Sequence, residues 1–185
     1  MSDGITFNNL SEANQYISDK QREGYEAYYI KKNNKYIVYI LGKVLNKHTS
    51  IRHVEKEEMY YKGDPAEYDF GKSEIRYTDS VNAKGKTHEI GHARLGHGDY
   101  NKNTTAKQIA REEIEAQIFA FTKNDKPINY EVAYPALLLM VDEKEDAKRS
   151  VFIVKDVLRE KGIDLPHEVE EHWIKFLEEK KTKEE

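Results

Sequence analysis

The sequence predicts an α+β fold that forms a single domain over residues 1–185. Tyrosines and β-branched residues gather in short runs within residues 1–80, as is typical of strands. Apolar residues recur at helical spacing through most of residues 84–180. We therefore expect a mainly β-sheet part with one helix at 1–80, a helical part at 84–180 and a frayed tail at 181–185.

Composition limits the classes of protein that the chain can belong to. It is 38% hydrophobic and 35% charged, and its 13 Tyr and 6 Phe must largely be buried, so we expect a folded chain. A net charge of −4 gives no general attraction for nucleic acid or an anionic membrane. No apolar run approaches about 20 residues, and no signal-peptide pattern opens the chain. The absence of cysteine excludes disulfides and thiolate metal ligands, and we expect a cytoplasmic protein.

The first part of the chain predicts a sheet with one helix. Residues 5–7 are a short strand, and Asn9 with Glu12 is a capping box that opens a helix to about residue 21. Residues 25–30 and 36–41 are strands joined as a hairpin. Two further stretches precede the histidine motif. Residues 46–61 are ambiguous and partly helical, and residues 73–78 alternate apolar and polar side chains as a strand does.

Residues 88–92 read His-Glu-Ile-Gly-His. On an α-helix, residues four apart differ by roughly 40° in azimuth and about 6 Å along the axis, so His88 and His92 can hold one metal ion between them. Glu89 lies roughly 100° further round, where a carboxylate can take a proton from a water molecule. This spacing is the signature of zinc-dependent peptidases, the zincins. The alternative is a surface helix that carries these residues by chance, but Leu95 lies on the same face, as on a packed helix.

A zincin needs a third protein ligand. One solution is the histidine of the longer motif H-E-x-x-H-x-x-G-x-x-H, but Gly96 and His97 stand at its ninth and tenth positions, so that register is wrong by one. The other solution is a glutamate on a second helix. Residues 104–121 predict such a helix, with Thr104 or Thr105 as its N-cap.

A helical wheel separates the glutamates of that second helix. Its apolar residues are Ile109, Ala110, Ile114, Ala116, Ile118, Ala120 and Phe121. Glu113 falls inside this apolar stripe, whereas Glu112 and Glu115 point outward. A carboxylate within an apolar stripe is costly unless a cation neutralises it, so Glu113 is the predicted third ligand. Downstream, helices are expected at 129–141, 142–161 and 166–180, with Pro135 as a kink or in a first turn.

The run His-Glu-Ile-Gly-His-Ala-Arg-Leu-Gly-His at 88–97, followed by Glu113-x-x-Ala116, resembles the ImmA/IrrE family of metallopeptidases. These belong to the gluzincins, the zincins whose third ligand is a glutamate. The resemblance covers residues 86–121. Gln117 departs from it, since family members commonly have asparagine at this position.

The resemblance implies a zincin-like fold in which a small N-terminal β-sheet accompanies an active-site helix, a glutamate helix and C-terminal helices. It implies Zn²⁺ held by His88, His92 and Glu113, with Glu89 as the general base. Co, Mn or Fe would also suit such ligands. In gluzincins an edge strand before the active helix binds substrate backbone, so residues 73–78 are expected to bind an extended peptide.

The expected activity is an intracellular zinc peptidase, for which the resemblance implies a transcriptional regulator or another regulatory protein as substrate. A donor for the tetrahedral oxyanion is also needed, and the candidates are His97, Tyr77 and Tyr134. His97 can equally be a surface residue or a partner of a ligand. Two alternatives to an active peptidase stay open. One is a non-catalytic module that binds a protein partner, and the other is a latent enzyme whose C-terminal helices cover the cleft.

Overall fold

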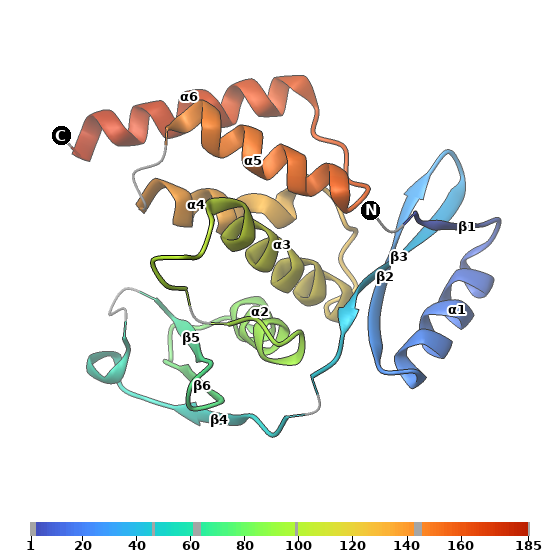
Figure 1. The fold of residues 1–185 in the computed structure, drawn as a ribbon, viewed down its shortest axis with the longest axis horizontal. Coiled ribbons are helices and arrows are strands. Elements are labelled where there is room, and N and C mark those ends of the chain that lie inside the picture. Colours follow the sequence, from blue (N-terminus) through green and yellow to red (C-terminus); the bar gives the residue numbers. More distant parts are fainter. Residues whose placement is uncertain (1–2, 46, 61–63, 99, 143–145, 185) are drawn as a thin grey trace.

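The computed structural model describes residues 3–45, 47–60, 64–98, 100–142 and 146–184. Within these residues the chain forms two three-stranded sheets and six α-helices, an α+β fold as the sequence predicts (Figure 1). The first sheet and its helix lie at one end of the molecule, and the second sheet lies below the helical part in Figure 1. None of the described helices is long and apolar enough to cross a membrane.

The first sheet has the order β1-β3-β2 and is antiparallel throughout. Its strands are β1 (Ile5–Phe7), β2 (Tyr25–Lys32) and β3 (Lys35–Lys43), and helix α1 (Leu10–Arg22) begins at the predicted cap Asn9. The hairpin turn is tighter than expected, because Asn33 and Asn34 both adopt positive φ. Ala27 and Val38 pack with α1, while the next residue, Tyr28, faces the helical core. This sheet therefore joins α1 to the rest of the protein.

The second sheet has the order β4-β6-β5 and consists of β4 (Ser50–His53), β5 (Ala66–Asp69) and β6 (Glu74–Tyr77). Strand β6 confirms the strand expected at 73–78, but its predicted place at the sheet edge is wrong. It lies in the middle, because β4 pairs with it in parallel and β5 pairs with it antiparallel. The ambiguous stretch at 46–61 contains β4 and the short 3₁₀ helix η1 (Lys56–Glu58).

The remaining elements are α2 (Ala83–Arg94), α3 (Ala106–Lys123), η2 (Tyr130–Ala133), α4 (Tyr134–Asp142), α5 (Ala147–Glu160) and α6 (His167–Glu184). Helix α3 is central, because α2 packs against it on one side and α4 and α5 pack against it on the other (Figure 1). Pro135 lies in the first turn of α4, and α6 extends beyond residue 180 to Glu184.

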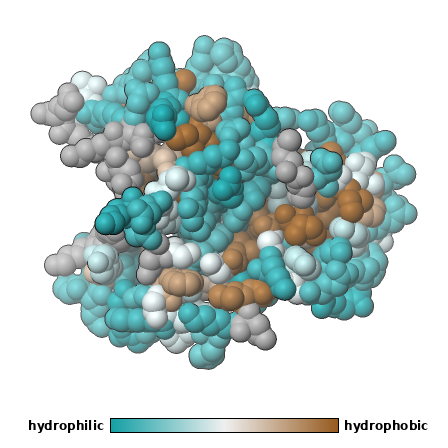
Figure 2. Space-filling view, in the orientation of Figure 1, coloured by the Kyte–Doolittle hydropathy of each residue, from teal (hydrophilic) through white to brown (hydrophobic). Residues whose placement is uncertain are grey.

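The main core lies between α3 and the C-terminal helices. Its largest fully buried side chains are Tyr28, Ile114, Ile118, Val132, Met140, Val151, Val154, Val157, Leu158 and Leu177. Hydrophilic residues cover most of the face drawn in Figure 2, and the hydrophobic residues form separate patches on it. Because the C-terminal helices pack on the face of α3 that is turned away from α2, they back this helix and do not lie over α2. This arrangement does not support the latent-enzyme alternative.

Candidate metal centre

Helix α2 holds both histidines of the motif. It begins at Asn82, whose side-chain oxygen accepts a hydrogen bond from the backbone N–H of Gly85 at 2.8 Å. His88 and His92 lie one turn apart on its inner face and are 8% and 7% exposed. Two polar rings buried side by side need partners, and α3 supplies them.

The two ligand helices approach closely at Gly91. A Cβ atom built on Gly91 would lie 3.0 Å from the backbone oxygen of Ala116 and 3.1 Å from its Cα, so a larger residue would force the helices apart. Glu113 lies one helical turn before Ala116, on the same side of α3. The glycine inside the histidine motif therefore brings α3 close enough for a glutamate to reach both imidazoles.

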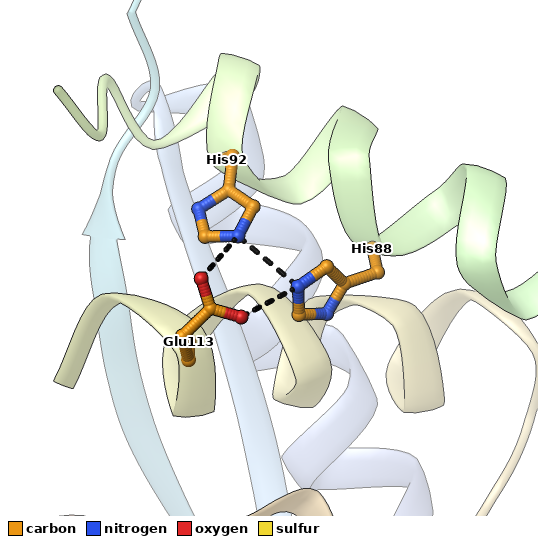
Figure 3. Close-up of side chains that lie close together, drawn as sticks. All are labelled: His88, His92 and Glu113. Carbon is orange, nitrogen blue, oxygen red and sulfur yellow. Dashed lines mark hydrogen bonds and ion pairs between the residues drawn. The ribbon is translucent and has the colours of Figure 1, made fainter. Parts of the chain in front are cut away.

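Figure 3 shows His88, His92 and Glu113 directed toward one another. The Nε2 atoms of the two histidines are 3.1 Å apart, Glu113 Oε2 is 3.1 Å from His88 Nε2, and Glu113 Oε1 is 3.3 Å from His92 Nε2. Ligands at the corners of a tetrahedral zinc site with bonds of about 2.0–2.2 Å are separated by about 3.3–3.6 Å. The three side chains are thus spaced almost as a metal would space them, and the cluster can hold an ion.

A hydrogen bond at Nδ1 of His88 determines which way the lone pair of the other ring nitrogen, Nε2, points. His88 Nδ1 lies 2.8 Å from Oε1 of Gln117, an amide oxygen that can only accept, so Nδ1 carries the hydrogen. In the neutral ring this leaves the lone pair of Nε2 directed at the cluster. The contact with Gln117 therefore leaves His88 Nε2 able to bind a metal ion.

His97 fixes His92 in the same way. The end of α2 is a Schellman motif, in which Gly96 adopts φ +69° and the backbone N–H of His97 bonds to the carbonyl of His92 at 3.0 Å. This turn places His97 Nδ1 2.9 Å from His92 Nδ1, and His97 Nε2 lies 2.9 Å from Oε2 of Glu115. A carboxylate only accepts, so His97 donates to it through Nε2 and accepts from His92 through Nδ1. The lone pair of His92 Nε2 is then directed at the cluster as well.

Glu115 was predicted to point outward, and this is wrong. Its side chain is largely buried. Its Oε1 accepts a hydrogen bond from Lys161 Nζ at 2.6 Å. The backbone oxygen of Lys161 in turn accepts from Tyr28 at 2.7 Å. The hydrogen bond from His97 and the charge of Lys161 together outweigh burial and lower the pKa of Glu115, so it is a carboxylate. A continuous series of buried polar contacts thus runs from His92 through His97 and Glu115 to the end of α5.

The pKa shifts within the cluster indicate that its environment favours a positive charge beside Glu113. Burial disfavours a charged imidazole, but Glu113 outweighs this effect at His88 and raises its pKa to about 9. Burial lowers the pKa of His92 to about 4. Burial would raise the pKa of Glu113, yet the two histidines hold it well below its usual range. Without metal, a proton on His88 supplies the positive charge, and a metal ion would displace that proton.

Glu89 follows His88 on α2, the helix that packs against β5 and β6 of the second sheet. Burial raises its pKa to about 8, and the negative charges of Glu113, Asp64 and Glu67 act in the same direction against the charge of His88. Asp64 also lines a cavity of about 340 Å³, whose other lining residues are Val54, Glu55, Lys56, Thr78, Asp79 and Ser80. The charge of Asp64, which lines this cavity, therefore acts on the candidate general base.

Of the three expected oxyanion donors, the structure places none at the cluster's outer edge. Tyr77 lies under Lys86, whose Nζ is 4.0 Å from the ring centroid, and Tyr134 packs against Trp173. His97 contacts the outer nitrogen of His92. Sequence reasoning missed Tyr100, whose hydroxyl donates to Oε1 of Glu113 at 2.7 Å. The available signal was its place in the short connection between the two ligand helices.

Replacing His97 by alanine is expected to lower the affinity for zinc by about 10- to 100-fold, because His92 loses the partner that fixes its inner lone pair. Glu115 keeps Lys161, so the fold should persist. Competition with a chelator of known affinity measures the effect. The matched control is His167→Ala on α6, where the histidine is exposed and pairs with the exposed Glu171. Equal losses in the two variants would contradict a role for His97 behind His92.

Comparisons of the chain with models of protein families, with curated proteins and with solved structures returned no match.

Proposed function

We propose that this protein is a zinc-dependent peptidase with a zincin-like site, in which His88, His92 and Glu113 hold the metal and Glu89 is the general base. The observation that supports this most directly is the convergence of two imidazole nitrogens and a carboxylate on one buried point, each within 3.3 Å of the next. Three electron-rich groups are stable together only around a cation.

The donor set suits zinc. Two neutral imidazoles and one carboxylate are a common set of protein ligands in catalytic zinc sites, which keep one further position open. The contacts of Gln117 and His97 to the outer nitrogens are the kind that orient zinc-binding histidines. When bound, the ion would polarise a water molecule and the substrate carbonyl.

The remaining chemistry belongs to Glu89. Its carboxylate accepts a proton from the attacking water and passes it to the nitrogen of the leaving amine. A base works best when its pKa is close to the working pH, and burial raises the pKa of Glu89 from its usual value toward that range in the metal-free protein. A merely structural metal site has no need of such a carboxylate, so Glu89 favours an enzyme over a non-catalytic module.

The surroundings of Glu89 favour an extended peptide as substrate. Strand β5 is at the edge of its sheet, α2 packs against that sheet, and the charge of Glu67 on β5 reaches Glu89. An extended segment could add along this edge. The 340 Å³ cavity at one end of this sheet, lined by residues that follow β4 and β6 and by Asp64 before β5, could take a side chain. The resemblance to the ImmA/IrrE family adds a transcriptional regulator as the kind of protein that carries this segment.

The test is metal analysis followed by a cleavage assay. We expect the purified protein to bind one zinc per chain and to cleave members of a mixed peptide library. We expect 1,10-phenanthroline to abolish cleavage and added zinc to restore it. Cleavage that survives complete removal of metal would overturn the proposal. Stoichiometric zinc without cleavage of any peptide or regulatory protein would favour the non-catalytic module that binds a protein partner.

A further inference from the structure

The connection between α2 and α3 brings one more functional group to the cluster. Tyr100 is 38% exposed, and its hydroxyl donates to Glu113 Oε1, the carboxylate oxygen that faces His92. It thus reaches from the protein surface to an atom of the ligand set. None of the donors expected from the sequence does this.

The backbone after Tyr100 is held in place by three short hydrogen bonds. Asn101 donates its N–H to Thr104 Oγ1 at 3.0 Å, Asn103 donates to Asn101 Oδ1 at 2.8 Å, and Thr104 donates to Asn101 O at 2.9 Å. Thr105 then caps α3. The backbone that follows Tyr100 is therefore held in place, and its ring, which is partly exposed, lies at the outer edge of the cluster.

Glu113 Oε1 is an anionic acceptor in the free protein, and a phenol donates well to such an atom. When water adds to a peptide carbonyl, the π electrons move to the carbonyl oxygen and create a second anionic acceptor beside the ligands. A hydrogen bond that is stronger to this oxygen than to the ground-state carbonyl accelerates the reaction.

We infer that Tyr100 is a catalytic residue, whose hydroxyl turns from Glu113 to donate a hydrogen bond to the oxyanion of the tetrahedral intermediate. This inference rests on the proposed peptidase function. It assigns no proton transfer to Tyr100, which stays a phenol throughout. The alternative role is positional, in which Tyr100 only holds Glu113 in place for the metal.

Two probes of the zinc-loaded full-length protein separate these roles. A tripeptide phosphonamidate carries a tetrahedral anionic group that resembles the intermediate, whereas acetohydroxamate is planar. We expect Tyr100→Phe to lower phosphonamidate affinity by about 10- to 100-fold, the range for a lost hydrogen bond to a charged group. Acetohydroxamate affinity and zinc affinity should change by less than about threefold. Tyr36→Phe, on the distant hairpin of the first sheet, should leave all three affinities unchanged.

Each other outcome is decisive. If Tyr100→Phe leaves phosphonamidate binding unchanged, or if the wild-type zinc protein does not bind the phosphonamidate, the inference is overturned while the zinc site stands. A tenfold or greater loss of zinc affinity in Tyr100→Phe assigns the positional role and also overturns it. A wild-type protein that binds no zinc overturns the proposed function first. Circular dichroism of each variant, with Tyr100→Leu as a second substitution, shows whether the fold is intact.

Discussion

Replacing Glu89 by glutamine is expected to abolish peptide cleavage and to leave zinc bound. Glutamine keeps the size of the side chain but cannot accept a proton from water, so kcat should fall by about 10²–10⁴-fold. The three residues of the cluster are unchanged, and zinc affinity should vary by less than about threefold. Parallel measurements of zinc content and cleavage rate test both statements. The matched control is Glu168→Gln, at an exposed position of α6, and equal cleavage by wild type and Glu89→Gln would remove the general-base assignment.

The same variant has a second expected effect, on the stability of the metal-free protein. The pKa of Glu89 is raised from 4.5 to about 8, so its favourable contribution to folding is fully present below about pH 4.5 and is lost as the pH rises through about 8. Glutamine does not titrate and avoids this loss. We expect urea unfolding at pH 5 to differ little between the two proteins, whereas at pH 9 Glu89→Gln should be more stable by on the order of 2 kcal/mol. A wild-type protein that is the more stable at pH 9 would contradict a buried, raised-pKa carboxyl.

Replacing Glu113 by glutamine should lower zinc affinity by about a thousandfold, on the order of 4 kcal/mol, which is the size expected when one partner of a buried charged group is removed. The amide oxygen is neutral, so the ion would keep two imidazoles and lose its only anionic protein ligand. In the metal-free protein, His88 would also lose the main cause of its raised pKa.

Glu112→Gln is the control for that measurement. Glu112 is adjacent to Glu113 on α3 but belongs to no part of the cluster, so its replacement should change zinc affinity by less than about threefold. Chelator competition at fixed pH gives both values. Comparable losses in the two variants would mean that negative charge on α3, and not a specific carboxylate oxygen, determines affinity.

The helical wheel singled out Glu113 because it lies among the apolar residues of α3. The structure buries those apolar residues, as the wheel requires. The same wheel failed for Glu115. It describes one helix in isolation, whereas Glu115 is buried by His97 from α2's terminus and by Lys161 from α5. Partners that come from distant parts of the chain leave no periodic signal in the helix that they cover.

Two other features show the same limit. Strand β6 was predictable from its alternation, but its central position depends on parallel pairing with β4, more than twenty residues earlier in the chain. Tyr100 lies in a connection, where no periodicity shows which way a side chain points. His97 could have been placed, because glycine at position 96 is the usual mark of a Schellman turn, and that turn brings the following residue back against the last turn of its helix.

The series of contacts from His92 to Lys161 means that the two ligand helices are not a self-sufficient metal-binding hairpin. Coupling between two sites is reciprocal. If an ordered end of α5 raises the affinity for metal, then bound metal must stabilise the end of α5 by the same free energy. Amide hydrogens around residues 161–163, on the far side of α3, should then exchange more slowly once zinc is bound. An ion bound by residues of two helices would thereby stabilise the C-terminal half of the chain against local unfolding.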